Sequence, residues 1–193
     1  SESPGGAFRS SQSRMIILAS DSPRRRELLA TLVGEFHVEP SRVDEHVRYK
    51  APWRMVEAIA EKKCDAVAGR HPEDVVIGAD TVVVFGGKVM GKPKDAAHAV
   101  EMLRALAGKR HTVYTGVCVS DRGVKTVWHE VSHVYMQKMS DEFIARYVAG
   151  GSPLDKAGAY GVQDEGTVER YDGEYANIMG LPLVRLAELL RER

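Results

Sequence analysis

Apolar residues along the chain fall into two kinds of pattern, and each kind predicts a different element of secondary structure. Near-continuous apolar runs over residues 15–19 and 75–85 predict strands, the second of them buried on both faces. Residues 36–39, 111–120 and 124–137 are also strand-like. Apolar residues spaced three or four positions apart predict helices that begin near Ser22, Pro52, Asp95, Ser140 and Pro182.

Two glycine-containing turns predict β-hairpins. Gly86-Gly87 separates the long apolar run from a short strand-like segment. Asp172-Gly173 separates residues 167–171 from residues 174–179, which we expect to form the second hairpin.

The first predicted helix begins with three consecutive arginines, Arg24, Arg25 and Arg26. Ser22 is a favourable N-cap residue, and Pro23 fits the first helical position, where a missing N–H is no loss. Cations in this turn face the positive end of the helix dipole, which costs about 0.3–1 kcal/mol for each exposed cation. Free N–H groups, hydroxyls and arginines at one helix start predict a phosphate-binding site. The alternative is a solvated basic turn.

Two charged residues interrupt apolar patterns. Lys63 falls on the apolar face of the helix predicted over residues 52–69. Its side chain either extends to the edge of that face or faces a buried carboxylate or a ligand phosphate. Asp80 interrupts the apolar run of residues 75–85 and needs a partner, a metal ion or an altered pKa, because an unpaired buried carboxylate is unfavourable. The alternative for Asp80 is a structural role in which backbone N–H groups satisfy it.

Residues 152–163 form a predicted loop of small residues with polar side chains at intervals. Its glycines would let the backbone approach a ligand closely. A packed structural loop explains the same composition equally well.

Composition argues against several classes of partner. The chain carries 27 basic and 27 acidic residues, so no net field favours nucleic acid or a membrane, and any anion site must be local. No apolar run approaches the ~20 residues of a membrane span. Cys64 and Cys118 lack the spacing of a metal site, which is typical of reduced cysteines in the cytoplasm. We therefore expect a cytoplasmic protein without a nucleic-acid or membrane partner, either monomeric or a homodimer.

We expect a single domain over residues 15–193, preceded by a flexible tail over residues 1–14. The tail is rich in Ser, Gly and Arg and contains no apolar run of the kind found in signal peptides.

Common nucleotide-binding and hydrolase signatures are missing from the sequence. It has no Walker A loop, no Gly-x-Gly-x-x-Gly after a strand, no nucleophile elbow and no zinc spacing. What remains is a set of basic residues with the carboxylates Glu45, Asp80 and Asp155, which suits a Mg²⁺–phosphate substrate. Hydrolysis then needs a positioned water and a base, for which Asp80 is the natural candidate. A serine nucleophile is disfavoured because no histidine lies near Ser20 or Ser22 in the sequence.

Five motifs occur in the order and spacing of a known family. They are Leu18-Ala19-Ser20-x-Ser22-Pro23-Arg24-Arg25, Gly78-Ala79-Asp80-Thr81, Gly91-Lys92-Pro93, Asp155-Lys156-Ala157-Gly158-x-Tyr160-Gly161-x-Gln163 and Gly180-Leu181-Pro182. On these motifs the chain resembles, from about Met15 to Leu190, the Maf family of nucleoside triphosphate pyrophosphatases, which is related in fold to the inosine triphosphatases. The resemblance implies an α/β fold in which an elongated, mixed and twisted sheet with flanking helices forms two lobes around a nucleotide cleft.

The resemblance also implies a reaction and a set of site residues. The reaction is the hydrolysis of a nucleoside triphosphate to the monophosphate and pyrophosphate, with Mg²⁺ or Mn²⁺ as the cofactor. Asp80 matches the family's proposed proton acceptor, and Glu45 and Asp80 are the expected metal ligands. The other polar site positions of the family fall on Ser20, Arg25, Lys63, Lys92 and Asp155. The resemblance thus favours the functional interpretation of Lys63.

Three positions separate groups within the family. Arg24, Thr81 and Gln163 match the group that resembles dTTP and UTP hydrolases, whereas the group that resembles 7-methyl-GTP hydrolases has Trp at the first position and Gln at the second. An amide such as that of Gln163 both donates and accepts, which matches the adjacent carbonyl and N–H of uracil or thymine. The chain departs from the family after Gln163, where a Gly-rich turn is often found and this sequence reads Asp164-Glu165-Gly166.

Two other functions stay open at this point. A non-catalytic nucleotide-binding regulator of cell division would use a similar cavity, but it would not need to keep both Asp80 and Lys92. A phosphatase that releases inorganic phosphate would use similar residues and would differ in its product.

Overall fold

Over residues 14–192, which the computed structural model describes, seven strands form one mixed sheet. They are β1 (Ile16–Leu18), β2 (His37–Val38), β3 (Val75–Phe85), β4 (Lys88–Met90), β5 (Arg110–Asp121), β6 (Val124–Met136) and β7 (Val168–Asp172). Their order is β2-β1-β3-β5-β6-β7, and β4 pairs with β3. β1 runs parallel to β2 and β3, and the other neighbours are antiparallel. The tail predicted over residues 1–14 lies outside the described residues, apart from Arg14.

Helices cover both faces of this sheet. They are α1 (Pro23–Ala30), α2 (Pro52–Ala68), α3 (Ala96–Leu106), α4 (Asp141–Ala149), α5 (Tyr175–Met179) and α6 (Val184–Arg191), with the 3-10 helices η1 (Ser152–Asp155) and η2 (Ala157–Ala159). Ser22, Asp95 and Ser140 cap α1, α3 and α4, as predicted, and each accepts a hydrogen bond from a backbone N–H of the first turn. None of the helices within residues 14–192 has the length and apolar character needed to cross a membrane.

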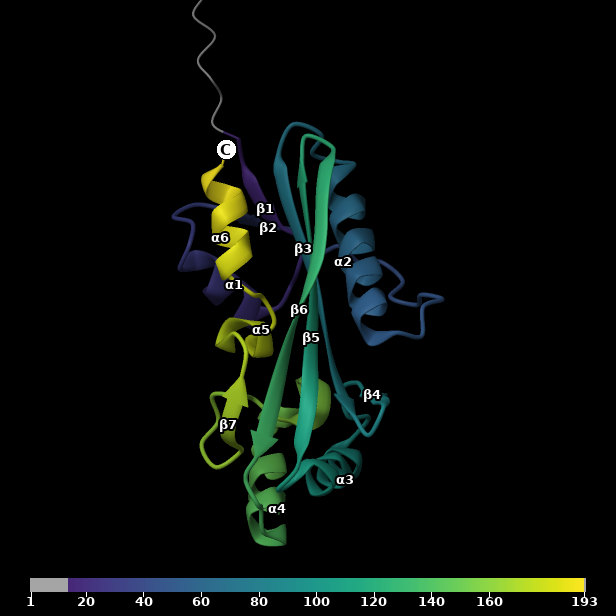
Figure 1. Ribbon diagram of the computed structural model, residues 1–193, viewed down its shortest axis with the longest axis vertical. Coiled ribbons are helices and arrows are strands. Elements are labelled where there is room, and N and C mark those ends of the chain that lie inside the picture. Colours follow the sequence, from purple (N-terminus) through teal and green to yellow (C-terminus); the bar gives the residue numbers. More distant parts are fainter. Residues whose placement is uncertain (1–13, 193) are drawn as a thin grey trace, which may run out of the picture.

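Three long strands, β3, β5 and β6, run most of the length of the molecule and twist about one another near its middle (Figure 1). In this view β1, β2, α1, α2 and α6 lie in the upper half, and β4, β7, α3 and α4 lie in the lower half. We call these halves the upper and lower lobes. The elongated mixed sheet with flanking helices that the resemblance implied is therefore confirmed, and both lobes share its central strands.

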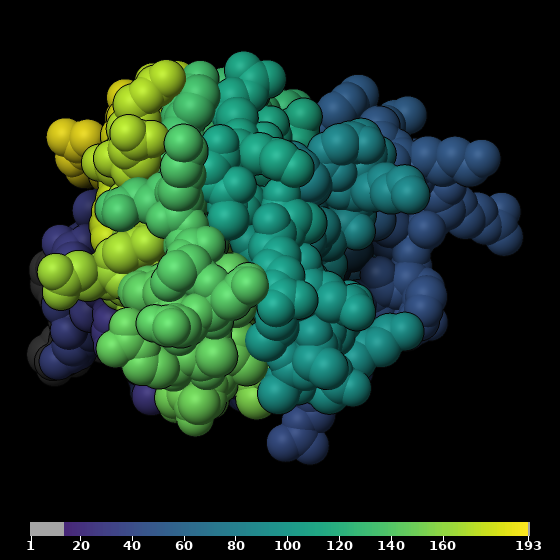
Figure 2. All heavy atoms as spheres, turned by 90° about the horizontal axis from the view of Figure 1, so that it is seen from below, coloured from purple at the N-terminus to yellow at the C-terminus, as the bar shows by residue number. Residues whose placement is uncertain are grey.

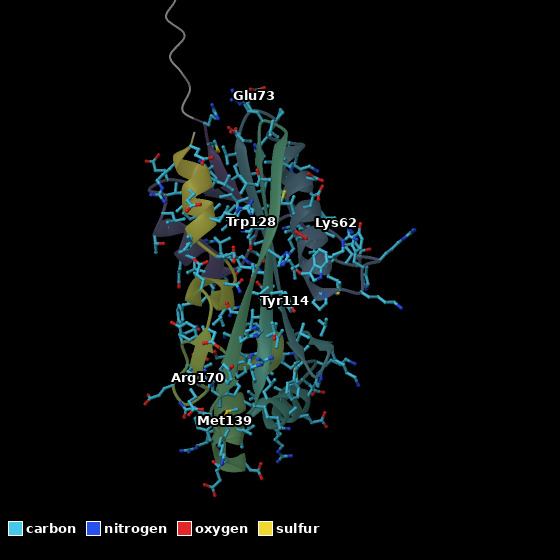
Figure 3. The ribbon with its side chains drawn as sticks, in the orientation of Figure 1. Lys62, Glu73, Tyr114, Trp128, Met139 and Arg170 are labelled. Carbon is cyan, nitrogen blue, oxygen red and sulfur yellow. The ribbon has the colours of Figure 1, made fainter. Side chains whose placement is uncertain are left out.

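Each lobe has its own hydrophobic core. In the upper lobe, α1 and α6 pack on one face of the sheet through residues such as Leu29 and Leu186, and α2 packs on the other face through Cys64 and Val67. In the lower lobe the core is formed by α3, α4 and the ends of the long strands. Figure 3 labels Trp128 in the upper lobe, Tyr114 near the middle of the sheet and Met139 beside α4. Seen from below in Figure 2, α3 (teal) and α4 (green) lie side by side and close the lower end.

Two glycines let α2 lie directly on the strands. A Cβ atom on Gly116 of β5 would lie 2.3 Å from the backbone carbonyl of Val56, and one on Gly78 of β3 would lie 2.5 Å from the carbonyl oxygen of Ala60. No side chain fits in this space, so the helix backbone rests against the sheet. This contact brings Lys63, one turn further along α2, over Asp80 of β3.

The second predicted hairpin is wrong. Residues 168–172 do form β7, which pairs with β6, but residues 175–179 form the short helix α5. The buried Asn177 explains the difference, because its side-chain nitrogen donates to the hydroxyl of Ser132 at 2.9 Å and faces the carbonyl of Val113 at 3.4 Å. These contacts with β5 and β6 hold the segment as a helical turn beneath the sheet, and they are invisible in the local pattern.

Candidate functional site

A cavity of about 980 Å³ lies between the two lobes, and every candidate site residue from the sequence lines it. These residues are Ser20, Arg24, Arg25, Glu45, Lys63, Asp80, Thr81, Lys92, Asp155 and Gln163. The upper wall is formed by α2, β3 and the turn that precedes α1. The lower wall is formed by the segment after β4 and by the segments around η1 and η2. Residues separated by up to 143 positions in the sequence thus converge on one space.

The ammonium of Lys63 lies between two carboxylates. Its Nζ atom is 3.1 Å from Oδ1 of Asp80 and 3.2 Å from Oε1 of Glu45, and it also donates to the carbonyl of Ala79 at 3.2 Å. Lys63 is only 8% exposed and Asp80 only 9% exposed. Lys63 therefore faces a buried carboxylate instead of extending to the edge of α2. Asp80 has this charged partner, so the structural alternative based on backbone N–H groups is wrong.

Burial raises the pKa of the Asp80 carboxyl above its usual value. The positive charges of Lys63 and Arg25 oppose this rise, whereas the nearby carboxylate of Glu45 adds to it. A buried carboxylate kept ionised by a lysine is a stronger base than a carboxylate in water, which is the property that a general base needs.

Arg25 points into the protein, so the alternative of a fully solvated basic turn is wrong for this residue. Its Nε donates to the carbonyl of Gly180 at 2.7 Å, and its Nη2 donates to the hydroxyl of Thr81 at 3.1 Å. Burial lowers the pKa of the guanidinium, and the negative charge of Asp80 opposes that effect. At the same helix start, the hydroxyl of Ser20 accepts from the backbone N–H of Ser22 at 3.1 Å.

A chain of buried hydroxyls fixes the direction of the Thr81 hydrogen bond. The Thr115 hydroxyl donates its hydrogen to the carbonyl of Asn177, which can only accept. Thr115 must therefore accept at its own oxygen, 2.9 Å from that of Thr81. Thr81 thus donates to Thr115 and accepts from Arg25, so its hydrogen points away from the cavity. The sequence analysis missed Thr115, although it is the direct cross-strand neighbour of Thr81 in the pairing of β3 with β5.

The predicted loop over residues 152–163 forms η1, η2 and a following turn, and its glycines allow a close backbone approach. Gly158 has φ of 74°, and its N–H donates to the carbonyl of Gly91 at 3.1 Å. This bond joins the turn that carries Lys92 to the loop that carries Asp155, so both side chains line the same wall. The loop is both packed and part of the cavity, which reconciles the two interpretations of its composition.

Two further basic residues line the cavity and were missed. Lys156 is buried, and its Nζ donates to the carbonyl of Ser152 at 2.7 Å and faces the carboxylate of Asp155 at 3.2 Å, so it anchors η1. Arg42 has φ of 52°, a left-handed conformation that is uncommon for residues other than glycine. Lys156 lies within the fourth family motif, but the sequence does not show that it is buried, and no local pattern marks Arg42.

Glu45 and Asp80 are the carboxylates of this wall that could hold a divalent cation. They approach one another closely enough to share the ammonium of Lys63. Over residues 14–192 no group of three or more His, Cys, Asp or Glu side chains could hold a metal ion. Two carboxylates beside a cavity with several cations fit Mg²⁺, which commonly uses one or two protein carboxylates together with phosphate oxygens and water.

Comparison with known proteins identifies the family of this chain. A family model described as Maf-like protein matches residues 15–193. The dTTP/UTP pyrophosphatase of Moorella thermoacetica is 49% identical over 180 residues, which cover 91% of this chain and 93% of the relative. The dTTP/UTP pyrophosphatase of Aquifex aeolicus is 44% identical over 179 residues, which cover 92% of this chain and 94% of the relative.

A solved structure shares the fold at low sequence identity. The Staphylococcus aureus Ham1 protein superposes with a TM-score of 0.53 and 16% identity, covering 93% of this chain and 99% of that protein. The family match over residues 15–193 and the high identity of the relatives over nine-tenths of the chain lead to one conclusion: the chain belongs to the Maf-like protein family.

Proposed function

We propose that this protein hydrolyses nucleoside triphosphates to nucleoside monophosphates and pyrophosphate, with a preference for dTTP and UTP. The contact of Lys63 with Asp80 carries the proposal, because it keeps a buried base ionised in a cavity lined by arginines and lysines. The names and high identity of the relatives support both the reaction and the preference for these two nucleotides.

In the proposed reaction Asp80 accepts a proton from water as the water oxygen forms a bond to the α-phosphorus. The bond from this phosphorus to the bridging oxygen then breaks, and pyrophosphate leaves with the electron pair. General-base catalysis of this kind contributes typically 10²–10⁴-fold. Lys63 supports the step because its positive charge favours the ionised form of Asp80 before the proton is transferred.

The basic residues of the cavity are proposed to bind the triphosphate. Arg24, Arg25 and Lys92 supply positive charge, and the turn before α1 supplies the hydroxyl of Ser20. Asp155 lines the same cavity as Lys92 and is proposed to contact the substrate there. Charge-assisted hydrogen bonds of this kind both orient the phosphates and stabilise the charge that develops on the leaving group.

Glu45 and Asp80 are proposed to hold Mg²⁺ or Mn²⁺ together with phosphate oxygens. The bound ion would neutralise phosphate charge and polarise the bond from phosphorus to oxygen. Lys63, which contacts both carboxylates, would hold them directed towards that position.

Gln163 is proposed to read the base. Its amide both donates and accepts, which matches the carbonyl and N–H groups of uracil and thymine. Thr81 donates its hydrogen to Thr115 and accepts from Arg25, so we propose that it holds Arg25 at the phosphates. We also propose a cytoplasmic location, since Cys64 and Cys118 are buried free thiols, which is typical of reducing compartments.

Product analysis tests the proposal. The purified protein is incubated with dTTP, UTP, ATP, GTP and 7-methyl-GTP in the presence of Mg²⁺, and pyrophosphate and inorganic phosphate are measured separately. We expect pyrophosphate and the monophosphate, with the highest kcat/KM for dTTP and UTP. Release of inorganic phosphate alone would identify a phosphatase. Binding without hydrolysis of any nucleotide would identify a non-catalytic regulator.

A further inference from the structure

Gln163 sits in a tight turn at the lower wall of the cavity. The N–H of Asp164 donates to the carbonyl of Gly161 at 3.0 Å, which closes a β-turn with Gln163 at its third position. Among residues 14–192 the Gln163 amide has no hydrogen-bond partner, so it is available to a ligand. The turn therefore sets the position of its backbone and the direction in which the side chain leaves it.

A single hydroxyl from α4 holds both ends of this turn. The hydroxyl of Tyr147 accepts from the N–H of Gly161 at 3.0 Å and donates to Oδ2 of Asp164 at 2.5 Å. The phenol has only one hydrogen, so the contact with the carboxylate also orients its lone pairs towards Gly161. From the other side, the hydroxyl of Thr167 donates to the carbonyl of Asp164 at 2.6 Å.

The rest of the loop packs on an aromatic pair of the same helix. The rings of Phe143 and Tyr147 stack with centroids 5.9 Å apart and an interplanar angle of 10°. Gly166 has φ of 84°, and a Cβ atom there would lie 2.8 Å from the Phe143 ring, so the backbone rests directly against it. Burial and the carboxylate of Asp164 raise the pKa of Tyr147, so the phenol stays protonated and remains a donor.

We propose that Tyr147 and Asp164 are positioning residues that set nucleobase selectivity by fixing the turn that carries Gln163. The inference rests on the proposed function, since it concerns the base that the same cavity accepts. Neither residue is among those that line the cavity. Asp164 is held by Tyr147, seventeen positions earlier in the sequence, and together they fix the backbone from which the exposed Gln163 side chain enters the cavity. A side chain on a fixed backbone reaches fewer positions against a base, whereas one on a mobile turn adapts to several bases and discriminates less.

Matched variants test the positioning role. Tyr147→Phe removes the hydroxyl and keeps the ring stacked on Phe143, and Asp164→Ala removes the carboxylate. Asp164→Asn keeps an oxygen that accepts from Tyr147 and is the conservative control. Tyr171→Phe changes an exposed tyrosine of β7, 42% exposed, and controls for the loss of a phenol elsewhere.

The measurement is kcat and KM for dTTP, UTP and GTP in each variant. We expect Tyr147→Phe and Asp164→Ala to lower the preference for dTTP over GTP about tenfold, through a higher KM for dTTP with little change in kcat. Asp164→Asn should retain most of the preference, and Tyr171→Phe all of it. An unchanged ratio in active Tyr147→Phe protein, or an equal loss of activity on every nucleotide, would overturn the proposal.

Measurements of nucleotide binding separate a failure of the positioning role from a failure of the proposed reaction. Affinities for the α,β-methylene analogues of dTTP and GTP, which cannot be cleaved to pyrophosphate, are measured by calorimetry with the same variants. If the wild-type protein binds the dTTP analogue more tightly and Tyr147→Phe abolishes that preference, the positioning role holds even where no hydrolysis is found. If the wild-type protein hydrolyses dTTP but the variants retain its binding preference, the reaction stands and the positioning role fails.

Discussion

The hydroxyl of Thr115 donates to the carbonyl of Asn177 over 3.0 Å, and this bond joins the middle of the sheet to α5. It also makes Thr115 an acceptor for Thr81, which in turn accepts from Arg25. Through Thr81, an arginine of the proposed phosphate site is thus oriented by Thr115, which is not among the residues that line the cavity.

Replacing Thr115 tests this chain of hydrogen bonds. Thr115→Val keeps the shape of the side chain but leaves the Thr81 hydroxyl and the Asn177 carbonyl without their buried partner, so we expect a loss of about 1–3 kcal/mol in unfolding free energy. We also expect a several-fold higher KM for the triphosphate, because Arg25 loses its fixed acceptor. Urea unfolding and steady-state kinetics measure the two effects. Thr115→Ser keeps the hydroxyl, and equal stability of the two variants would contradict the role of this bond.

Asp80→Asn should lower pyrophosphate release by about 10²–10⁴-fold while substrate is still bound. The substitution keeps the size of the side chain and removes the basicity of the carboxylate. Circular dichroism and nucleotide binding establish that the variant is folded. A folded variant that keeps more than about a tenth of the wild-type activity would show that another group is the base.

Lys63→Met should move the acidic limb of the pH profile of kcat/KM to higher pH. Burial raises the pKa of Asp80, and the charge of Lys63 opposes that rise, so removing the lysine raises this pKa further. Because the ionised carboxylate is the active form, activity at low pH falls first, and we expect a shift of about one pH unit or more. Lys62→Met is the matched control, since Lys62 is the neighbouring lysine on the same helix and donates to the carbonyl of His46. If the acidic limb of the pH profile of kcat/KM were identical in the two variants, Asp80 would be excluded as the titrating group.

His111 should make the protein sensitive to mild acid. Its Nε2 lies 2.6 Å from the hydroxyl of Tyr160, and burial lowers the pKa of the imidazole to about 4. The unfolded chain binds a proton below about pH 6.5, whereas the folded chain does so only near pH 4. The contribution to stability is thus present above pH 6.5 and is lost as the pH falls towards 4, by roughly 3 kcal/mol in total.

Urea unfolding of the wild-type protein and of His111→Gln between pH 7 and pH 4.5 measures this loss. Gln cannot titrate, so the stability of the variant should fall less steeply over the same range. Parallel curves for the two proteins would assign the acid sensitivity to other groups.

Local features were the most predictable part of the fold. The starts of α1, α3 and α4 follow from a capping side chain and the turn next to it, and such signals lie within a few residues of one another. The pairing of β3 with β4 follows in the same way from Gly86-Gly87. Lys63 and Asp80 stood out because each breaks an apolar pattern, and a buried charge must have a partner.

Features that depend on distant pairing could not be predicted. Residues 174–179 have a composition compatible with a strand, but Asn177 in their middle contacts β5 and β6 from a short helix. The importance of Thr115 depends on its register opposite Thr81, which no single strand reveals. The sequence showed that the turn after Gln163 departs from a Gly-rich pattern, but not that Asp164 meets Tyr147.

The continuous sheet that joins the two lobes has a consequence for how such a protein can evolve. Lys63 and Asp80 belong to α2 and β3, whereas the turn with Gln163 is held by α4 in the lower lobe. Residues in α4 or in that turn can therefore be substituted without disturbing the register of β3 or the position of the proposed base. A lineage built on this scaffold can acquire a new nucleotide through changes in the lower wall of the cavity while Lys63 and Asp80 in the upper wall are inherited unchanged.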